Sequence, residues 1–220
     1  MTLTPLTPSW FFGYNVALEL VFGVITLIVS LYALKIYRTI NLNHIKYLSL
    51  SFAFISLSYI IKSIFNFLII FKINENILGI VKIQSIVFFD AIGLYAHIFF
   101  MTLGLVTLTF MTFKSKKTRI LWLMLVTSLF AIFLNINTWF MFFLFSTTYL
   151  LFLSLHFISN YLQNRQKKIL LIALAFLFLL FGNFHLLISI NHQLSYAIGP
   201  LLEFVAYLLI LINLYMVKKK

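Results

Sequence analysis

Seven long apolar runs are the feature that most limits how this chain of 220 residues can fold. A helix needs about 20 apolar residues to cross about 30 Å of hydrocarbon. The runs are continuous rather than alternating, which favours membrane-spanning helices over the strands of a transmembrane barrel. The sequence therefore predicts an all-α, polytopic membrane protein. We expect a single seven-helix transmembrane domain over 1–220, with helices at approximately 11–34, 47–71, 84–113, 120–136, 138–160, 169–190 and 196–217.

Composition supports this class and argues against others. Only 9% of the residues are charged and 63% are hydrophobic, whereas about a quarter of a soluble domain is charged. The net charge of +12 comes from short basic clusters between apolar runs, so we expect the lipid bilayer, and no nucleic acid, as a partner. The chain has no cysteine, which excludes disulfides and thiolate metal sites. The segment before the first run lacks a basic region and a small-residue cleavage site, which predicts that this run is kept as a spanning helix.

The basic residues also predict an orientation. Most of the 16 Lys and Arg residues follow the first, third and fifth runs or form the C-terminal tail, and only Lys72 and Lys82 lie in the loop on the other side. The positive-inside rule then places the N-terminus outside and the C-terminus in the cytoplasm. We therefore expect a multi-pass protein of the cell membrane. Its basic loops are the candidate surface for a cytoplasmic partner.

A weak internal repeat links the two halves of the chain. The first and fifth runs both begin with "WF", "KYLSLSFAF" (46–54) resembles "KILLIALAF" (168–176), and "AIGLYAH" (91–97) resembles "AIGPLLE" (197–203). These matches predict two parallel three-helix repeats joined by the fourth helix. The layout resembles the 3+1+3 arrangement of the sugar-efflux SWEET proteins and the KDEL receptor, in architecture only, because the proline-glutamine dipeptide of that superfamily is absent. The first two runs also resemble uncharacterised small seven-helix membrane proteins of archaea, a resemblance that implies no activity.

Charged and polar side chains inside the apolar runs mark the candidate site, because an ionisable residue at that depth is costly and by default functional. Lys62 and Asn66 share one face of the second helix, and we expect Lys62 to pair with Asp90 or Glu19. The predicted orientation places the set in the outer half of the bilayer, where the helices converge on a polar cavity. The candidate ligand-binding or proton-coupling residues are Glu19, Lys62, Asn66, Asp90, His97, Asn183, His185 and Glu203.

Several chemistries are possible for this set of residues. His97 and His185 with a carboxylate suit zinc or iron, or a haem, but no histidine pair with i, i+4 spacing is present. The seventh run has no lysine for a retinal Schiff base, and no hydrolase motif occurs. We therefore assign no catalytic residue, expect no cofactor, and expect a colourless purified protein with less than stoichiometric iron or zinc.

The sequence predicts a membrane protein that binds a small polar solute or ion in the cavity, as a transporter or a sensor. Three carboxylates, a lysine and two histidines at similar depth exceed what helix association requires, although polar groups also serve to hold helices together. Intramembrane carboxylates and histidines often form proton relays in transporters. The alternative is a membrane-embedded metal- or haem-dependent enzyme or redox protein.

Overall fold

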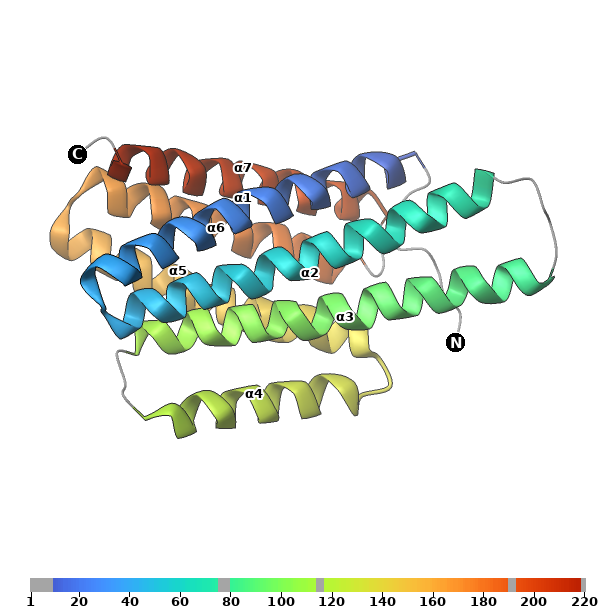
Figure 1. Ribbon diagram of the computed structural model, residues 1–220, viewed down its shortest axis with the longest axis horizontal. Coiled ribbons are helices and arrows are strands. Elements are labelled where there is room, and N and C mark those ends of the chain that lie inside the picture. Colours follow the sequence, from blue (N-terminus) through green and yellow to red (C-terminus); the bar gives the residue numbers. More distant parts are fainter. Residues whose placement is uncertain (1–9, 75–79, 114–116, 190–192, 219–220) are drawn as a thin grey trace.

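The computed structural model describes residues 10–74, 80–113, 117–189 and 193–218. Figure 1 shows the helices lying side by side along the long axis of one elongated bundle. This all-helical architecture confirms the predicted fold class. The described residues form seven helices: α1 (Phe12–Ile40), α2 (Asn43–Asn74), α3 (Ile80–Thr112), α4 (Thr118–Phe133), α5 (Thr138–Asn164), α6 (Lys167–Ile188) and α7 (Gln193–Lys218).

Within the described residues, six helices are long and apolar enough to cross a membrane, and α4 is the exception. With 16 residues, α4 is about 24 Å long at about 1.5 Å per residue, which is short of the hydrocarbon thickness. Figure 1 shows α4 at the edge of the bundle, beside α3. The chain is therefore a multi-pass integral membrane protein, and α4 lies outside the packed set of long helices.

The helices extend further than the apolar runs at one end of the bundle. We expected the first helix to end near 34 and the second to start near 47, yet only Asn41 and Leu42 separate α1 from α2. Similarly, only Arg165 and Gln166 separate α5 from α6. Asn41 and Arg165 adopt left-handed conformations, with φ of 55° and 52°, which end the preceding helices. The predicted bounds were short here because hydropathy marks the part of a helix inside the hydrocarbon, while polar residues continue the helix beyond it.

The long helices pack as two groups of three. In the first group α2 lies between α1 and α3, and in the second group α6 lies between α5 and α7. The groups meet where α1 contacts α7 and where α3 contacts α5, while α4 contacts only α3 and α5 in the described part of the chain. A 3+1+3 arrangement would have this pattern of contacts. The sequence repeat itself stays a prediction.

Close backbone approaches hold each group together. A Cβ atom on Gly23 of α1 would lie 2.7 Å from the side chain of Ile60, and a Cβ on Gly104 of α3 would lie 2.5 Å from Ile55. In the second group, a Cβ on Gly182 of α6 would lie 2.9 Å from the carbonyl oxygen of Gly199. Small residues at such crossings let membrane helices pack at short range. The helices within each group are therefore tightly joined.

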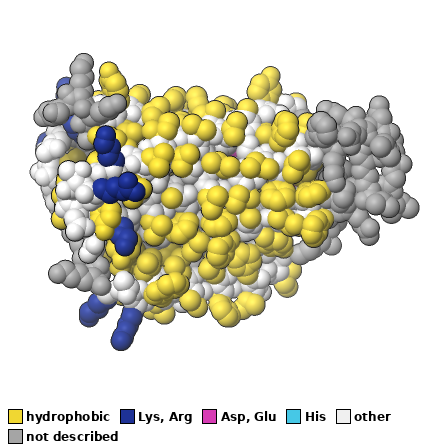
Figure 2. All heavy atoms as spheres, in the orientation of Figure 1, with side chains coloured by type: hydrophobic (Ala, Val, Ile, Leu, Met, Phe, Trp, Pro, Cys, Tyr) yellow, Lys and Arg dark blue, Asp and Glu magenta, His cyan; other side chains and the backbone are white. Residues whose placement is uncertain are grey.

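The surface of the bundle is apolar around its middle and basic at one end. Figure 2 shows a broad hydrophobic band, with the visible Lys and Arg side chains gathered at the end where α1 turns into α2. Buried positions in contrast include many Ser, Thr and Asn side chains, together with Glu19, His97 and Glu203. A lipid solvent favours this distribution, in which the surface of the protein is apolar and the interior is partly polar. The side chains of Lys72 and Lys82, which we assigned to the opposite end, lie outside the described residues.

Candidate functional site

An ion pair between α1 and α2 forms one side of the site. The Lys62 Nζ atom lies 2.9 Å from Glu19 Oε1. The Asn15 side-chain amide donates to Glu19 Oε1 at 2.8 Å, and the Asn66 amide donates to Glu19 Oε2 at 2.8 Å. Asn15 precedes Glu19 by one helical turn and Asn66 follows Lys62 by one turn, so each pair shares a helix face. Of the two partners that the sequence left open for Lys62, the structure gives Glu19.

A second carboxylate faces the first across the bundle. The Tyr59 hydroxyl of α2 donates to Glu203 Oε2 of α7 at 3.1 Å, and the Tyr207 hydroxyl donates to the Tyr59 oxygen at 3.2 Å. All three side chains are buried. The two tyrosines form a short chain of hydrogen bonds that ends on the carboxylate. This chain connects the first group of helices to the second.

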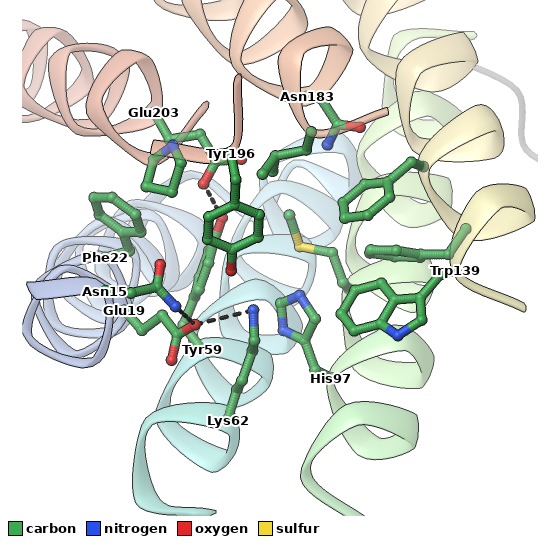
Figure 3. Close-up of a pocket in the computed structure, with 15 residues that line it drawn as sticks. Asn15, Glu19, Phe22, Tyr59, Lys62, His97, Trp139, Asn183, Tyr196 and Glu203 are labelled. Atoms are coloured by element: carbon green, nitrogen blue, oxygen red, sulfur yellow. Dashed lines mark hydrogen bonds and ion pairs between the residues drawn. The ribbon is translucent and has the colours of Figure 1, made fainter. Parts of the chain in front are cut away.

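His97 of α3 lies beside these groups. Its Nδ1 atom is 2.6 Å from the Ser58 hydroxyl of α2, and the ring centroid is 5.6 Å from that of Tyr59 and 5.7 Å from that of Phe142. The hydrogen bond with Ser58 therefore fixes one nitrogen of the His97 ring, and the contacts with Tyr59 and Phe142 fix the plane of that ring. Figure 3 shows the His97 ring next to the Lys62 ammonium group.

These side chains surround a small cavity, which we call the polar cavity. About 30 Å³ of it admits the centre of a water-sized sphere, which is room for one or a few water molecules or a comparably small ion. Figure 3 shows Lys62, Tyr196 and His97 converging on its middle. Its lining comes from every long helix: Asn15, Glu19, Phe22, Tyr59, Lys62, His97, Met101, Trp139, Phe142, Phe143, Asn183, Leu186, Tyr196, Pro200 and Glu203.

The structure brings together five of the eight predicted site residues. Glu19, Lys62, His97, Asn183 and Glu203 line the polar cavity. Asn66 does not line the cavity, but it donates a hydrogen bond to Glu19, which does.

Asp90 and His185 do not line the polar cavity. Asp90 is on the same side of α3 as His97, but it lies about two helical turns, or about 10 Å, further along the axis. His185 follows Asn183 by two residues, and two residues rotate about 200° around a helix. The His185 Nδ1 atom is buried without a hydrogen-bond partner among the described residues.

Two tyrosines and one asparagine of the site were not predicted from the sequence. Tyr59 precedes Lys62 by three residues, Tyr207 follows Glu203 by four, and Asn15 precedes Glu19 by four. Side chains at these spacings share a helix face. The spacing from a charged residue could have identified these three side chains. Tyr and Asn are common throughout the chain, however, so the spacing alone did not single them out.

Three further cavities, each sharing lining residues with the one before it, lie between the polar cavity and the basic end. A narrow neck shares Met101, Asn183 and Glu203 with the polar cavity. An apolar chamber of about 260 Å³ follows and shares Phe52 and Phe176 with the neck. A vestibule of about 900 Å³ then opens beside His44, Lys46 and Asn160. The four cavities lie in a row between the two helix groups.

The candidate zinc, iron or haem site of the sequence depends on the grouping of ligand side chains in the described residues. No three His, Asp or Glu side chains there are grouped so that they could hold one metal ion. His97 lines the polar cavity and His185 does not, so these two candidate ligands face different surroundings.

The fold and its apolar surface define a class, the multi-pass integral membrane proteins built as helical bundles. No known protein family, curated protein or solved structure matches this chain. Its function is therefore inferred from the residues of the polar cavity and from the contacts between the two helix groups.

Proposed function

We propose that this protein binds a small polar solute or ion in the polar cavity and moves it across the membrane. The observation that carries the proposal is the position of the cavity between two tightly packed helix groups, with ionisable side chains from both. Glu19, Lys62 and His97 come from the first group, and Glu203 comes from the second. A ligand bound there contacts both groups at once.

A role in binding explains the charged residues better than a role in holding helices together. Helix packing within the first group already has hydroxyl contacts such as the reciprocal bonds between Ser30 and Ser49. A buried ion pair is costly to desolvate, and apolar residues often replace it without loss of stability. The Glu19–Lys62 pair, moreover, borders a cavity instead of being fully enclosed by packed side chains. Ionisable residues in this setting mark solute or ion pathways.

Movement of the solute is supported by the arrangement of contacts. Within each group the helices approach at glycines and share serine-to-backbone hydrogen bonds, such as Ser56 to Gly23 and Ser154 to Phe176. Between the groups, the side-chain hydrogen bonds of the described residues are those of Tyr59 with Glu203 and Tyr207. Two stiff units that meet around a site fit alternating access, in which one unit rocks against the other. The cavities that share lining residues between this site and the basic end support a route for the solute in that direction.

A cysteine scan of access tests this proposal without knowledge of the solute. The chain contains no cysteine, and Met101 lines both the polar cavity and the neck. Met101→Cys in right-side-out and inside-out vesicles is treated with a small charged thiol reagent that does not cross lipid. We expect modification from both sides, because a transporter opens its site alternately.

The matched control is Ile132→Cys, which is fully buried in α4 and does not line the polar cavity. It should react far more slowly from either side. Modification of Met101→Cys from one side only contradicts transport and supports a sensor. A rate no higher than that of the control from both sides overturns the proposal.

A further inference from the structure

We infer that the bound species is a small monovalent cation and that it exchanges with a proton on Glu203. The inference depends on the proposed function, because it names the ligand of the same cavity. It comes from the balance of charge around the cavity, from its size and from its lining.

Of the two carboxylates that line the polar cavity, Glu203 is the one whose charge is not balanced. Glu19 and Lys62 neutralise one another at 2.9 Å. Among the described residues, no Lys, Arg or His side chain forms an ion pair with Glu203. Its one hydrogen bond between described side chains comes from the neutral hydroxyl of Tyr59.

The other groups around Glu203 do not supply a full positive charge. From α7 itself come the hydroxyls of Tyr207 and Tyr196, and from α3 comes His97, which is held by Ser58. From α1 and α2 come the paired Glu19 and Lys62, and from α2 also Tyr59. The residues that α5 and α6 contribute to the cavity carry no titratable group: Trp139, Phe142, Phe143, Asn183 and Leu186.

A carboxylate in this position has two stable forms. Glu203 is 6% exposed, and a charge removed from water is either neutralised by a proton or paired with an opposite charge. The protonated form is neutral and needs no counter-ion. The ionised form needs a cation in the cavity. The two forms exclude one another, so the proton and the cation compete for the same side chain.

The cavity suits a small monovalent cation. About 30 Å³ accommodates a species the size of a water molecule, which fits an alkali-metal ion or ammonium and is too small for a sugar or an amino acid. The carboxylate of Glu203 and the hydroxyl of Tyr196 provide oxygen atoms at the cavity wall. The aromatic lining, including Phe22 and Trp139, adds ring faces that attract cations. An anion is disfavoured because the ammonium of Lys62 is already matched by Glu19.

The exchange step is balanced and involves no redox change. The O–H bond of the protonated Glu203 carboxyl breaks, and the proton leaves to water. The cation enters and forms an ionic contact with the carboxylate that remains. The reverse step restores the carboxylic acid and releases the cation.

Proton release on cation binding tests this inference. Purified full-length protein in weakly buffered detergent receives NaCl, KCl or NH₄Cl, and a pH-sensitive dye follows released protons. Choline chloride controls for ionic strength, because its cation is too large for the cavity. We expect about one proton released per cation bound, and an apparent affinity about tenfold weaker for each unit of lower pH while Glu203 is protonated. The salt that gives the response distinguishes alkali ions from ammonium.

Variants connect the response to one residue. Glu203→Gln should abolish both cation binding and proton release. Asp90→Asn should keep both, because Asp90 is a carboxyl of a membrane helix that does not line the cavity. Glu203→Asp should keep the exchange with altered affinity, and it serves as the second variant if Glu203→Gln does not fold. Infrared difference spectra of the wild type should lose a carboxylic acid carbonyl band when the cation is added.

Several outcomes overturn the inference. These are cation binding without proton release, a full response in Glu203→Gln, a response lost in Asp90→Asn alone, and no response to any of the three salts. If no salt gives a response while Met101→Cys is modified from both sides, the inference fails and the proposed function stands. If Met101→Cys is also unreactive from both sides, both fail.

Discussion

Tyr59 and Glu203 are joined by a hydrogen bond of 3.1 Å between α2 and α7. Together with the 3.2 Å bond from Tyr207 to Tyr59, it provides the side-chain hydrogen bonds that cross between the two helix groups in the described structure. One buried phenol therefore connects the halves of the bundle at the wall of the polar cavity. Any motion that separates the groups must break or lengthen these bonds.

Replacement of this phenol should destabilise the protein. Tyr59→Phe keeps the ring and leaves Glu203 and Tyr207 without their hydrogen-bond partner, which costs about 1–3 kcal/mol for a buried polar group. Thermal unfolding in detergent measures the loss. Tyr14→Phe is the matched control, because Tyr14 is 69% exposed and such a change is usually within about 0.5 kcal/mol. Equal stability of the two variants would show that the bond contributes nothing.

The ion pair of Lys62 predicts a specific pattern of rescue. Lys62→Met leaves the buried Glu19 unpaired, and Glu19→Gln leaves the partly buried Lys62 unpaired. Breaking such a pair typically costs about 3–5 kcal/mol, whereas removal of both partners is often nearly neutral. The double variant should therefore recover most of the thermal stability lost in either single variant. Lys62→Met combined with Asp90→Asn should show no such recovery, since Asp90 is not the partner. Recovery with Asp90 instead of Glu19 would contradict the pairing.

The contact between α6 and α7 predicts a sharp difference between two glycines. In Gly182→Ala the new Cβ would lie 2.9 Å from the Gly199 carbonyl oxygen and 3.1 Å from Glu203 Cγ. Since a helix backbone cannot move away alone, we expect a loss of about 1–3 kcal/mol and weaker binding at Glu203. In Gly13→Ala nothing lies within 4 Å of the new atom, so no loss is expected. Thermal unfolding of the pair compares them, and similar midpoints would contradict close packing at Gly182.

The predicted orientation has a direct test at the two ends of α5. Ile136 in the turn before α5 is 95% exposed, and Asn164 is the last residue of α5. On intact cells an impermeant maleimide should label Ile136→Cys, because the positive-inside rule places this turn outside. Asn164→Cys should be labelled only after the membrane is opened. The reverse pattern would place the N-terminus in the cytoplasm.

Hydropathy was enough to predict the helices but not their full extent. Apolar runs identified all seven helices because lipid selects strongly on side-chain polarity. The segments from Lys35 to Ile40 and from Tyr161 to Asn164 were missed because their polar side chains are compatible with a helix outside the hydrocarbon.

The sequence was enough to predict how deep in the membrane the site residues lie, but not which way each helix is rotated about its axis. Position along a helix follows from counting residues, and Glu19, Lys62 and Glu203, which the sequence placed at similar levels, line one cavity. Which neighbour a side chain faces depends on how the helices rotate against one another, and that is decided by packing at positions such as Gly23 and Gly182. The choice between Asp90 and Glu19 therefore could not be made from the sequence.

The two-residue connection between α1 and α2 has a consequence for biogenesis. On translocon-based insertion scales, a lysine at the centre of an isolated helix costs about 2.5–3.5 kcal/mol. Because only Asn41 and Leu42 separate α1 from α2, Glu19 is already tethered near Lys62 when α2 leaves the ribosome. We therefore expect the two helices to insert as a hairpin in which the charges of Glu19 and Lys62 neutralise one another. A reporter of insertion should record poor integration of α2 alone and efficient integration of α1 with α2, and Glu19→Gln should lower the latter.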